Sequence, residues 1–308
     1  MKALPLYEPL SPAEVEAIDQ AALRVLEEVG IEARDQEILE LYRRAEARIE
    51  GSRVFLPGTV VQREVRRAPA EVVLCGRDPR HDLRLTGTNV HVGTGGAALD
   101  VLDLDTGEAR PARLQDVADL ALLVENLENI HFFLRPCEPR DVPLDRVDVN
   151  KYYAAFTHTT KHVMGSVHGL DGLRQSLELA ALVSGGPEAY RQRPILSFIG
   201  CWMVSPLTLE PAITRVILEA VRQHAPVVLS TAPMAGSTSP LTLAGTLVQT
   251  HAELLSGIAL TQIAAPGAPV LYGAVPSLSN LRTGRYLGGP IEFGMLQAAA
   301  AQLARAWK

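Results

Sequence analysis

The sequence predicts an α/β protein built around a parallel sheet, and two features of its C-terminal two thirds carry this prediction. Apolar runs of strand length alternate with helical segments from Arg113 onwards. The stretch 226–277 reads as strand, loop, helix, turn and strand, which is the order of a βαβ unit. Between Arg222 and Arg282 the only formally charged side chain, with His counted as neutral, is Glu253. The apolar runs do not alternate with polar residues, as is typical of parallel strands covered on both faces.

The composition indicates a globular protein and excludes several classes of function. Hydrophobic residues make up 47% of the 308 residues and charged residues 21%, the balance of a folded domain. The net charge of −6 argues against a nucleic-acid partner. The N-terminus has no signal-peptide core, and Pro, Gly and polar residues interrupt the apolar centre, so no membrane association is expected. Cys75, Cys137 and Cys201 lie far apart, which suits a reducing cytoplasm and predicts a cytoplasmic protein.

Residues 1–110 are expected to form an α+β segment ahead of the main domain. Ser11-Pro12-Ala13-Glu14 is a helix start, with Ser as the N-cap and Glu at the third helical position. Gly30 ends the apolar periodicity that follows. The next expected elements are a helix, a strand and a helix at about 35–47, 53–56 and 57–69.

A glycine-rich loop lies among the short strands expected between 71 and 103. It reads Gly93-Thr-Gly-Gly-Ala97 and could cradle a phosphate group. However, no Lys-Ser/Thr pair follows, and Leu99 to Leu104 alternates like a strand instead of opening a helix. We therefore expect a plain glycine turn, with a position near a ligand left open.

Residues 111–308 are expected to form the main domain, a parallel sheet with right-handed crossovers. The expected strands are 130–135, 162–167, 195–201, 227–230 and 270–273, each followed by a helix. Such a sheet either stays open, as in a doubly wound fold, or closes into a TIM-type (β/α)8 barrel. The first strand-to-helix turn, Arg135-Pro-Cys-Glu-Pro-Arg140, lacks the Gly-x-Gly-x-x-Gly of a dinucleotide fold. We therefore favour the barrel.

The predicted barrel is incomplete, because about five βα units can be counted where the fold needs eight. The early segment could contribute strands that its pattern does not reveal. Our preferred interpretation is that the sequence is a truncated or naturally shortened version of a longer parent.

A polar stripe runs along the long helix behind the fourth strand. Its members fall at i, i+4, i+7, i+11 and i+14, and they are Thr242, Thr246, Gln249, Glu253 and Ser256. On a barrel helix such a stripe normally faces outward, so Glu253 is not expected to be catalytic. A stripe with one charged residue in five positions is too weakly charged to face open solvent. We therefore expect a second subunit to cover the stripe, which predicts a homo-oligomer.

Three stretches of the sequence resemble the trimethylamine methyltransferase (MttB-like) family of corrinoid-dependent methyltransferases. They are Val92-Gly-Thr-Gly-Gly-Ala-Ala-Leu-Asp-Val-Leu-Asp-Leu-Asp-Thr-Gly-Glu108, then Val228-Leu-Ser-Thr-Ala-Pro-Met-Ala-Gly-Ser-Thr-Ser-Pro-Leu-Thr-Leu-Ala-Gly245, then Ala268-Pro-Val-Leu-Tyr-Gly273 with Arg282-Thr-Gly284. The resemblance spans nearly the whole chain in order, and the middle stretch is long and specific. It implies a TIM barrel behind an N-terminal α+β extension.

The resemblance also implies an activity within methylamine metabolism and methanogenesis. The enzyme would move a methyl group from a tertiary or quaternary amine, such as a betaine, to the Co(I) of cob(I)alamin or a related corrinoid. A separate corrinoid protein would carry that cofactor, so this chain would bind none directly. Family members run on past residue 308, and the pyrrolysine of trimethylamine-specific members falls in the part that is missing here. The chain is therefore identified as a non-pyrrolysine or truncated member.

Six candidate substrate-binding residues follow the expected strands, because a parallel barrel places its working residues at the carboxyl ends of its strands. They are Glu138, His168, Trp202, Met234, Tyr272 and Arg282. Arg282 could clamp a substrate carboxylate, and Trp202 and Tyr272 could wall a cation pocket. Glu138 could counter the ammonium charge, although its place beside Arg140 suits a surface ion pair. No catalytic residue is assigned.

Two other functions remain open from the residues alone. His158 and His162 have the i, i+4 spacing of a zinc-binding helix face, and with His168 they could serve a metal-dependent barrel lyase or hydrolase. However, the expected helix ends between the first two, so the pair is expected to diverge and no metal site is predicted. The other alternative is a non-catalytic truncated remnant, because an unclosed sheet exposes its edges.

Overall fold

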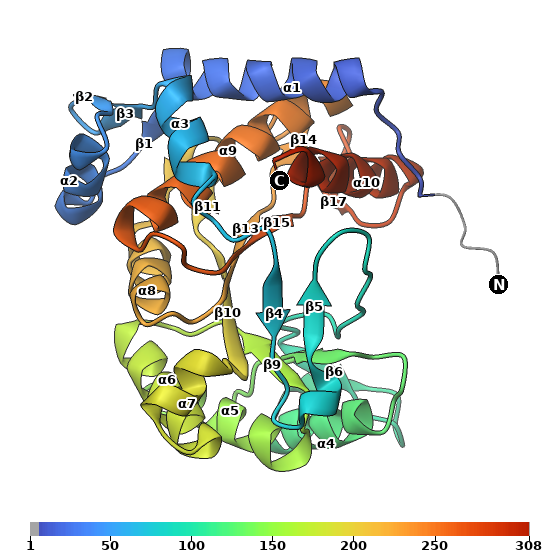
Figure 1. Ribbon diagram of the computed structural model, residues 1–308. Helices are drawn as coiled ribbons and strands as arrows, with labels where there is room; N and C mark the ends of the chain where they lie inside the picture. Colours follow the sequence, from blue (N-terminus) through green and yellow to red (C-terminus); the bar gives the residue numbers. More distant parts are fainter. Residues whose placement is uncertain (1–5, 308) are drawn as a thin grey trace. The chain divides into compact units, whose positions relative to one another are not determined.

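The computed structural model describes residues 6–307 and shows a mixed α/β chain (Figure 1). The helices are α1 (Pro12–Arg24), α2 (Gln36–Arg44), α3 (Gly58–Val65), α4 (Leu114–Glu125), α5 (Val147–His158), α6 (Leu170–Ser184), α7 (Pro187–Gln192), α8 (Pro211–Arg222), α9 (Leu243–Ala264) and α10 (Ile291–Ala306), with a π-helical turn η1 (Val25–Val29) and a 3₁₀ turn η2 (Pro79–His81). Among the described helices, none combines the length and apolarity needed to cross a bilayer.

The strands fall into five sheets within the described residues. They are β1 (Ile31–Glu32), β2 (Arg48–Glu50), β3 (Arg53–Phe55), β4 (Val72–Leu74), β5 (Leu83–Leu85), β6 (Asp100–Leu102), β7 (Ala109–Pro111), β8 (Phe132–Leu134), β9 (His162–Gly165), β10 (Leu196–Cys201), β11 (Met203–Val204), β12 (Thr208–Leu209), β13 (Val227–Thr231), β14 (Met234–Ala235), β15 (Val270–Ala274), β16 (Ser277–Ser279) and β17 (Tyr286–Leu287). The expected parallel strands appear in one sheet in the order β15-β13-β10-β9-β8, and no sheet of residues 6–307 closes on itself.

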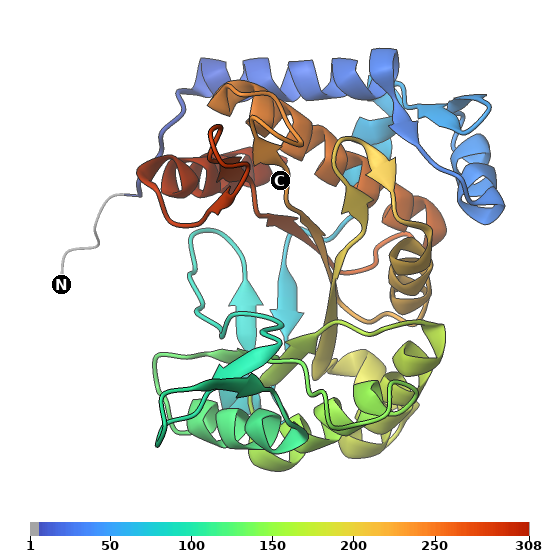
Figure 2. The same ribbon diagram turned by 180° about the vertical axis from the view of Figure 1, so that it is seen from behind.

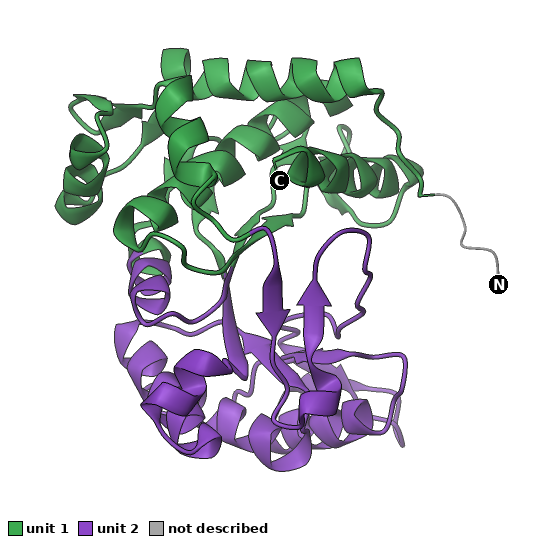
Figure 3. Cartoon of the chain, in the orientation of Figure 1, with its two compact units in different colours: residues 1–69, 200–214, 228–308 green, residues 70–199, 215–227 purple. Residues whose placement is uncertain are grey.

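The chain divides into two compact units, coloured separately in Figure 3. Unit 1 comprises Met1–Pro69, Gly200–Thr214 and Val228–Lys308, and unit 2 comprises Ala70–Ile199 and Arg215–Val227. The division of the sequence into domains at residue 110 stays a prediction.

In unit 2, strands β8, β9 and β10 pair in parallel and in register. Phe133 of β8 is the partner of Val163 in β9, and Leu196 of β10 is paired with the same valine. All three side chains are buried, because parallel strands covered on both faces are apolar throughout. Helices α4, α5 and α6 pack side by side along this part of the sheet (Figure 2).

A further parallel segment, which the sequence pattern did not reveal, lies beside β8. Gly93 forms a parallel bridge with Phe132, and Ala98 forms another with Cys137. Gly93 lies so close to the Phe132 ring that a Cβ atom there would overlap it. The glycine-rich loop therefore runs between two isolated parallel bridges, with Ala97 in a left-handed conformation, and it opens no helix.

Unit 1 is organised around α9, whose residues are buried on nearly every face. Helices α1, α3 and α10 all pack against it. The predicted start of α1 is confirmed, because Ser11 and Glu14 form the reciprocal hydrogen bonds of a capping box. The segments that follow β13 and β15 also pair with each other, since Met234 of β14 is the parallel partner of Ser277 in β16.

The expectation that the polar stripe of α9 faces outward to a second subunit is wrong. Glu253 is fully buried within unit 1 and accepts hydrogen bonds from the Ser205 and Thr231 hydroxyls, the Leu207 amide and the Gln249 side chain. Neutral donors of the same chain therefore surround Glu253. Thr246, Gln249 and Ser256 of the stripe are also buried, whereas Thr242, at the start of α9, is exposed. The homo-oligomer stays a prediction without this support.

Burial of Glu253 makes the free energy of unfolding depend on pH. Burial raises the pKa of Glu253, against the opposing effect of its hydrogen bonds. A carboxyl whose pKa is raised on folding contributes stability below its unfolded pKa and loses it as pH rises through the folded pKa. The Glu253→Gln variant does not lose stability in this way, because its side chain does not ionise. Its amide can donate to the hydroxyls of Ser205 and Thr231. Its free energy of unfolding relative to the parent should therefore increase from pH 4 to pH 7.

Urea unfolding at a series of pH values measures this difference. Glu292→Gln, at an exposed position of α10, is the matched control for the loss of a surface carboxylate. A Glu253→Gln variant that becomes less stable than the parent as pH rises would mean that the carboxylate is favoured in its charged form.

Candidate functional site

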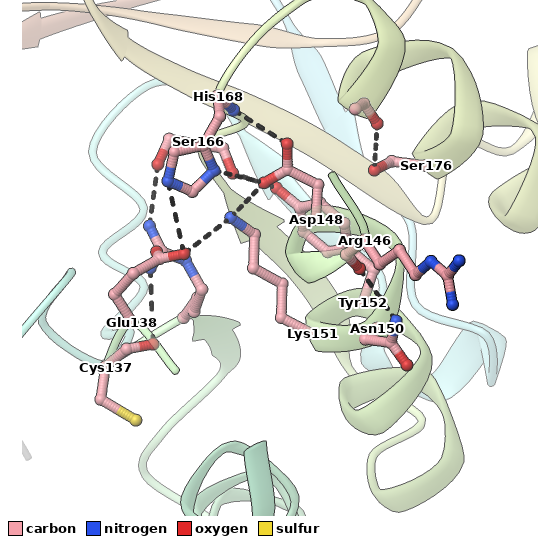
Figure 4. A network of polar contacts seen from close by, with 12 residues as sticks. Cys137, Glu138, Arg146, Asp148, Asn150, Lys151, Tyr152, Ser166, His168 and Ser176 are labelled. Atoms are coloured by element: carbon pink, nitrogen blue, oxygen red, sulfur yellow. Dashed lines mark hydrogen bonds and ion pairs between the residues drawn. The ribbon is translucent and has the colours of Figure 1, made fainter. Parts of the chain in front are cut away.

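Five ionisable side chains meet in unit 2 at the carboxyl ends of β8 and β9, and we call them the charged cluster (Figure 4). They are Arg135, Glu138, Asp148, Lys151 and His168. The carboxyl ends of parallel strands lie at the same edge of a sheet, which is where barrel enzymes place their working residues.

Three short segments position the cluster. Arg135 and Glu138 directly follow β8, and His168 follows β9. Asp148 and Lys151 lie three residues apart in the first turns of α5, so both side chains project from one face of that helix.

Arg135 and Glu138 form the first ion pair of the cluster. One amino group of Arg135 contacts Glu138 Oε2, and the other donates to Ser166 Oγ at 2.8 Å. The Arg135 side chain is buried, and its Nε has no hydrogen-bond partner in the described residues. The guanidinium is thus fixed from two directions while one of its donors remains unused.

Lys151 forms ion pairs with both carboxylates of the cluster. Its side chain is 0% exposed, and Nζ lies 2.6 Å from Asp148 Oδ1 and 3.4 Å from Glu138 Oε1. Burial, together with the nearby Arg135 charge, lowers the pKa of Lys151 to about 8, against the attraction of Asp148. The two carboxylates keep this buried ammonium charged at neutral pH.

Asp148 holds His168 at two points. Its Oδ2 accepts the His168 backbone N–H at 2.9 Å, and its Oδ1 lies 2.9 Å from His168 Nδ1. Burial alone would raise the pKa of Asp148, but the Lys151 charge and the hydrogen bonds from Lys151 and His168 hold it below its ordinary value. An ionised carboxylate only accepts hydrogen bonds, so Nδ1 of His168 carries the hydrogen and Nε2 lies outside this contact.

Gly172 leaves the space that Asp148 occupies. A Cβ atom at this position in the first turn of α6 would overlap the Asp148 carboxylate. A glycine inside a helix is otherwise unfavourable, so close packing against Asp148 explains it here. The start of α6 therefore helps to set the position of the whole cluster.

The charges of the cluster balance when His168 is neutral. Arg135 and Lys151 supply two positive charges, and Glu138 and Asp148 supply two negative charges. His168 differs from the other four because its side chain is 41% exposed. The arrangement can therefore present one imidazole nitrogen to a ligand in a fixed tautomer and with fixed orientation.

The structure brings together two of the six predicted substrate residues. Nε2 of His168 lies 3.8 Å from Glu138 Oε1. Glu138 is paired with Arg135 and Lys151 and not, as considered from the sequence, with the adjacent Arg140. The other four residues belong to unit 1, and the assignment of all six to substrate binding stays a prediction.

Two of those four, Trp202 and Tyr272, are aromatic. Trp202 is buried, its ring lies against Gly257 of α9, and its indole N–H has no partner in the described residues. The Tyr272 hydroxyl lies 2.9 Å from His251 Nδ1, and the other ring nitrogen of His251 lies 3.0 Å from Asp19 Oδ1. Trp202 therefore packs against α9, and Tyr272 is hydrogen-bonded to His251, both within unit 1.

Met234 and Arg282 lie on the small sheet β14-β16-β17 of unit 1. Met234 is in β14, and its backbone N–H donates to Thr238 Oγ1 at 2.9 Å. Arg282 is exposed in the turn between β16 and β17, where its backbone N–H donates to Asn280 Oδ1 at 3.0 Å. One sheet thus carries both residues.

Three members of the charged cluster were missed as site residues in the sequence, namely Arg135, Asp148 and Lys151. Arg135 was noted only as a strand-end residue. Asp148 and Lys151 carried a usable signal, because an acid and a base three residues apart open the helix that follows the first parallel strand. Their burial, which distinguishes them from a surface pair, could not be read from that spacing.

The histidines of the alternative metal site do not come together. His162 is buried, with Nδ1 bonded to the Cys75 carbonyl oxygen and Nε2 at 2.7 Å from Ser197 Oγ. His158 bonds to the Ala154 carbonyl oxygen within α5. Within residues 6–307 no three His, Cys, Asp or Glu side chains are grouped as metal ligands would be.

Comparison with known proteins relates the whole chain to one family. The sequence model of the family described as Trimethylamine methyltransferase (MTTB) matches residues 1–308. The chain is 34% identical over 304 residues to a glycine betaine methyltransferase of Desulfitobacterium hafniense (strain Y51), which covers 98% of this chain and 63% of that protein.

Two further relatives are named trimethylamine methyltransferase MttB. The protein of Desulfitobacterium hafniense (strain DSM 10664 / DCB-2) is 34% identical over 297 residues, covering 96% of this chain and 60% of its own length. The protein of Methanosarcina thermophila is 33% identical over 303 residues, covering 95% and 62%. The chain thus spans about three fifths of the length of the curated relatives it matches.

Replacing Gly172 tests whether its missing side chain makes room for Asp148. Helix propensity alone predicts that Gly172→Ala stabilises the protein by about 1 kcal/mol. Displacement of Asp148 instead predicts a loss of about 1–3 kcal/mol in the free energy of unfolding, the usual cost of overpacking. Gly294→Ala is the matched control, because Gly294 is an exposed residue of α10 with open space around it. Urea unfolding that shows both variants equally stabilised would contradict the packing.

Replacing Lys151 tests the charge balance of the cluster. Lys151→Met leaves two carboxylates without their shared buried cation, and we expect the free energy of unfolding to fall by about 3–5 kcal/mol. Arg174→Met removes an exposed partner of Asp171 at the same i, i+3 spacing and should cost at most about 1 kcal/mol. Equal losses in thermal or urea unfolding would show that burial adds nothing to the Lys151 contacts.

Proposed function

The chain belongs to the trimethylamine methyltransferase family, and on this premise we propose that it forms part of an enzyme that transfers a methyl group from a methylated amine to a corrinoid. The family match over residues 1–308 is the observation that carries this proposal. The location of the charged cluster at the carboxyl ends of β8 and β9 supports it, because barrel enzymes work at that edge.

We propose a partial (β/α)8 barrel as the scaffold. The parallel order β15-β13-β10-β9-β8 supports it, and the parallel bridges of Gly93 and Ala98 extend that order by one segment. Successive strands of the order are joined by helices, as in a barrel wall.

The proposed reaction is a displacement at carbon. The C–N bond of the substrate breaks, both electrons stay on nitrogen, and the methyl group passes to a nucleophile. The Co(I) of a corrinoid carried by a separate protein is the proposed nucleophile. The chain would then hold the amine, orient one methyl group and keep water out, which are the tasks of positioning and desolvation.

The charged cluster is the proposed polar side of the amine site. Both oxygens of Glu138 already face cations, so Glu138 offers no uncompensated charge to an ammonium group. His168 is the exposed member and the one that a substrate can reach. The methyl groups of the amine need no hydrogen-bond partner, so apolar or aromatic faces would contact them.

The setting of the reaction follows from its chemistry. Co(I) is strongly reducing, and the three free cysteines of the chain suit the same reducing compartment. We therefore place the reaction in the cytoplasm, with a corrinoid protein as the macromolecular partner. The homo-oligomer stays a prediction.

A spectral assay tests the proposal. The chain, and the longer protein wherever its reading frame continues, is mixed with cob(I)alamin and with glycine betaine, trimethylamine or tetramethylammonium. Formation of methylcobalamin, followed by its absorption spectrum and absent without an amine, is the expected result. No spectral change for either protein with any of the three amines would contradict the proposed function. Activity of the longer protein alone would assign the remaining chemistry to residues beyond this chain.

A further inference from the structure

We infer that His168 gives a proton to the departing amine and thereby prevents the amine from taking the methyl group back. This inference rests on the proposed function and assigns a chemical step to one residue of the charged cluster. It follows from the geometry of the His168 ring, from the burial of its neighbours, and from the basicity of the product.

Asp148 holds the His168 ring through Nδ1, and Nε2 takes no part in this contact. Asp148 fixes Nδ1–H and the backbone N–H of the same residue, at 2.9 Å each. Nε2 points toward Glu138 Oε1, which lies 3.8 Å away, further than a hydrogen bond. A small amine nitrogen can therefore approach Nε2 without displacing the Asp148 contact.

Carboxylates lie on two sides of the ring. Asp148 accepts from Nδ1–H, and Glu138 Oε1 lies 3.8 Å from Nε2. Lys151 and Arg135 bear the opposing charges, and each contacts at least one of these carboxylates. On the following helix, Asp171 is exposed and pairs with Arg174.

The other members of the cluster are poorly suited to donate. The side chain of Lys151 is 0% exposed, and that of Arg135 is buried and permanently charged. Glu138 and Asp148 are ion-paired carboxylates, which accept protons and do not supply them. His168, with 41% of its side chain exposed, can both reach a ligand and regain a proton from water.

The chemistry of the product requires such a donor. When the C–N bond breaks, the electron pair stays on nitrogen, and the leaving amine is neutral, basic and nucleophilic. That lone pair can attack the transferred methyl group and reverse the reaction. If Nε2–H of His168 gives its proton to the lone pair, an N–H bond forms, the amine becomes an ammonium ion, and His168 is left neutral. Water at the exposed side of the ring then returns the proton.

Forward turnover and reverse exchange together measure this step, because the acid for the leaving amine in one direction is the base for the same amine in the other. Forward turnover is followed with glycine betaine and cob(I)alamin. Reverse exchange is followed with methylcobalamin and deuterated dimethylglycine, and labelled betaine reports it. For a preparation active on trimethylamine, deuterated dimethylamine is the probe. Both rates should fall by about 100-fold in His168→Ala, the lower range of what a positioned acid contributes.

Two controls separate a chemical role from a structural one. Thermal unfolding reports damage to the fold, which would also lower both rates. Added imidazole should restore both rates in His168→Ala, because the native ring is 41% exposed, whereas a damaged fold would not be rescued.

The outcomes distinguish this inference from the proposed function. Parent rates of turnover and exchange in His168→Ala would overturn the role of His168 and leave the methyltransferase proposal intact. A parent protein that neither forms methylcobalamin nor exchanges label would overturn the methyltransferase proposal itself.

Discussion

The buried contact between Asp148 and Lys151 is the interaction on which the charged cluster depends. It puts an acid and a base of one helix turn at 2.6 Å, away from water. Neither charge could remain there alone, because an unpaired buried ion costs several kcal/mol, roughly 3–5 when one partner is removed. Once paired, Asp148 has enough accepting capacity left to hold both the backbone and the ring of His168. The orientation of the His168 ring thus depends on the buried ion pair between Asp148 and Lys151.

The two units bury carboxylates by different means, and the acidities of these groups differ accordingly. In unit 2 a cation and hydrogen bonds keep the pKa of Asp148 below its ordinary value. In unit 1 only neutral donors surround Glu253, and burial raises its pKa. A hydrogen bond from a hydroxyl or amide stabilises a carboxylate less than an adjacent charge does. Asp148 therefore holds its charge at neutral pH with a cation's help, while Glu253 is biased toward its protonated form.

The helices and the parallel strands could be predicted from the sequence because their signals are local. The Ser11 capping box and the apolar run around Val163 depend on near neighbours in the chain, and both are confirmed. The parallel segment at Gly93 could not be recognised, because its pairing depends on Phe132, which is remote in sequence. Glu253 was placed outward on the assumption that every barrel helix has a solvent face, and burial by three distant donors carries no local signal. Among the site residues, Glu138 and His168 were selected, whereas the buried pair that orients them depends on tertiary packing.

The placement of Trp202 has a practical consequence for spectroscopy. The chain contains two tryptophans, Trp202 and Trp307, and both belong to unit 1. Trp202 is buried and its indole N–H has no acceptor in the described residues, an apolar setting in which indole emits at shorter wavelength than in water. Tryptophan fluorescence of this protein is therefore a reporter of unit 1 alone. Unit 2, which contains the charged cluster, contributes only tyrosine, so a label placed there would be needed to follow the two units separately.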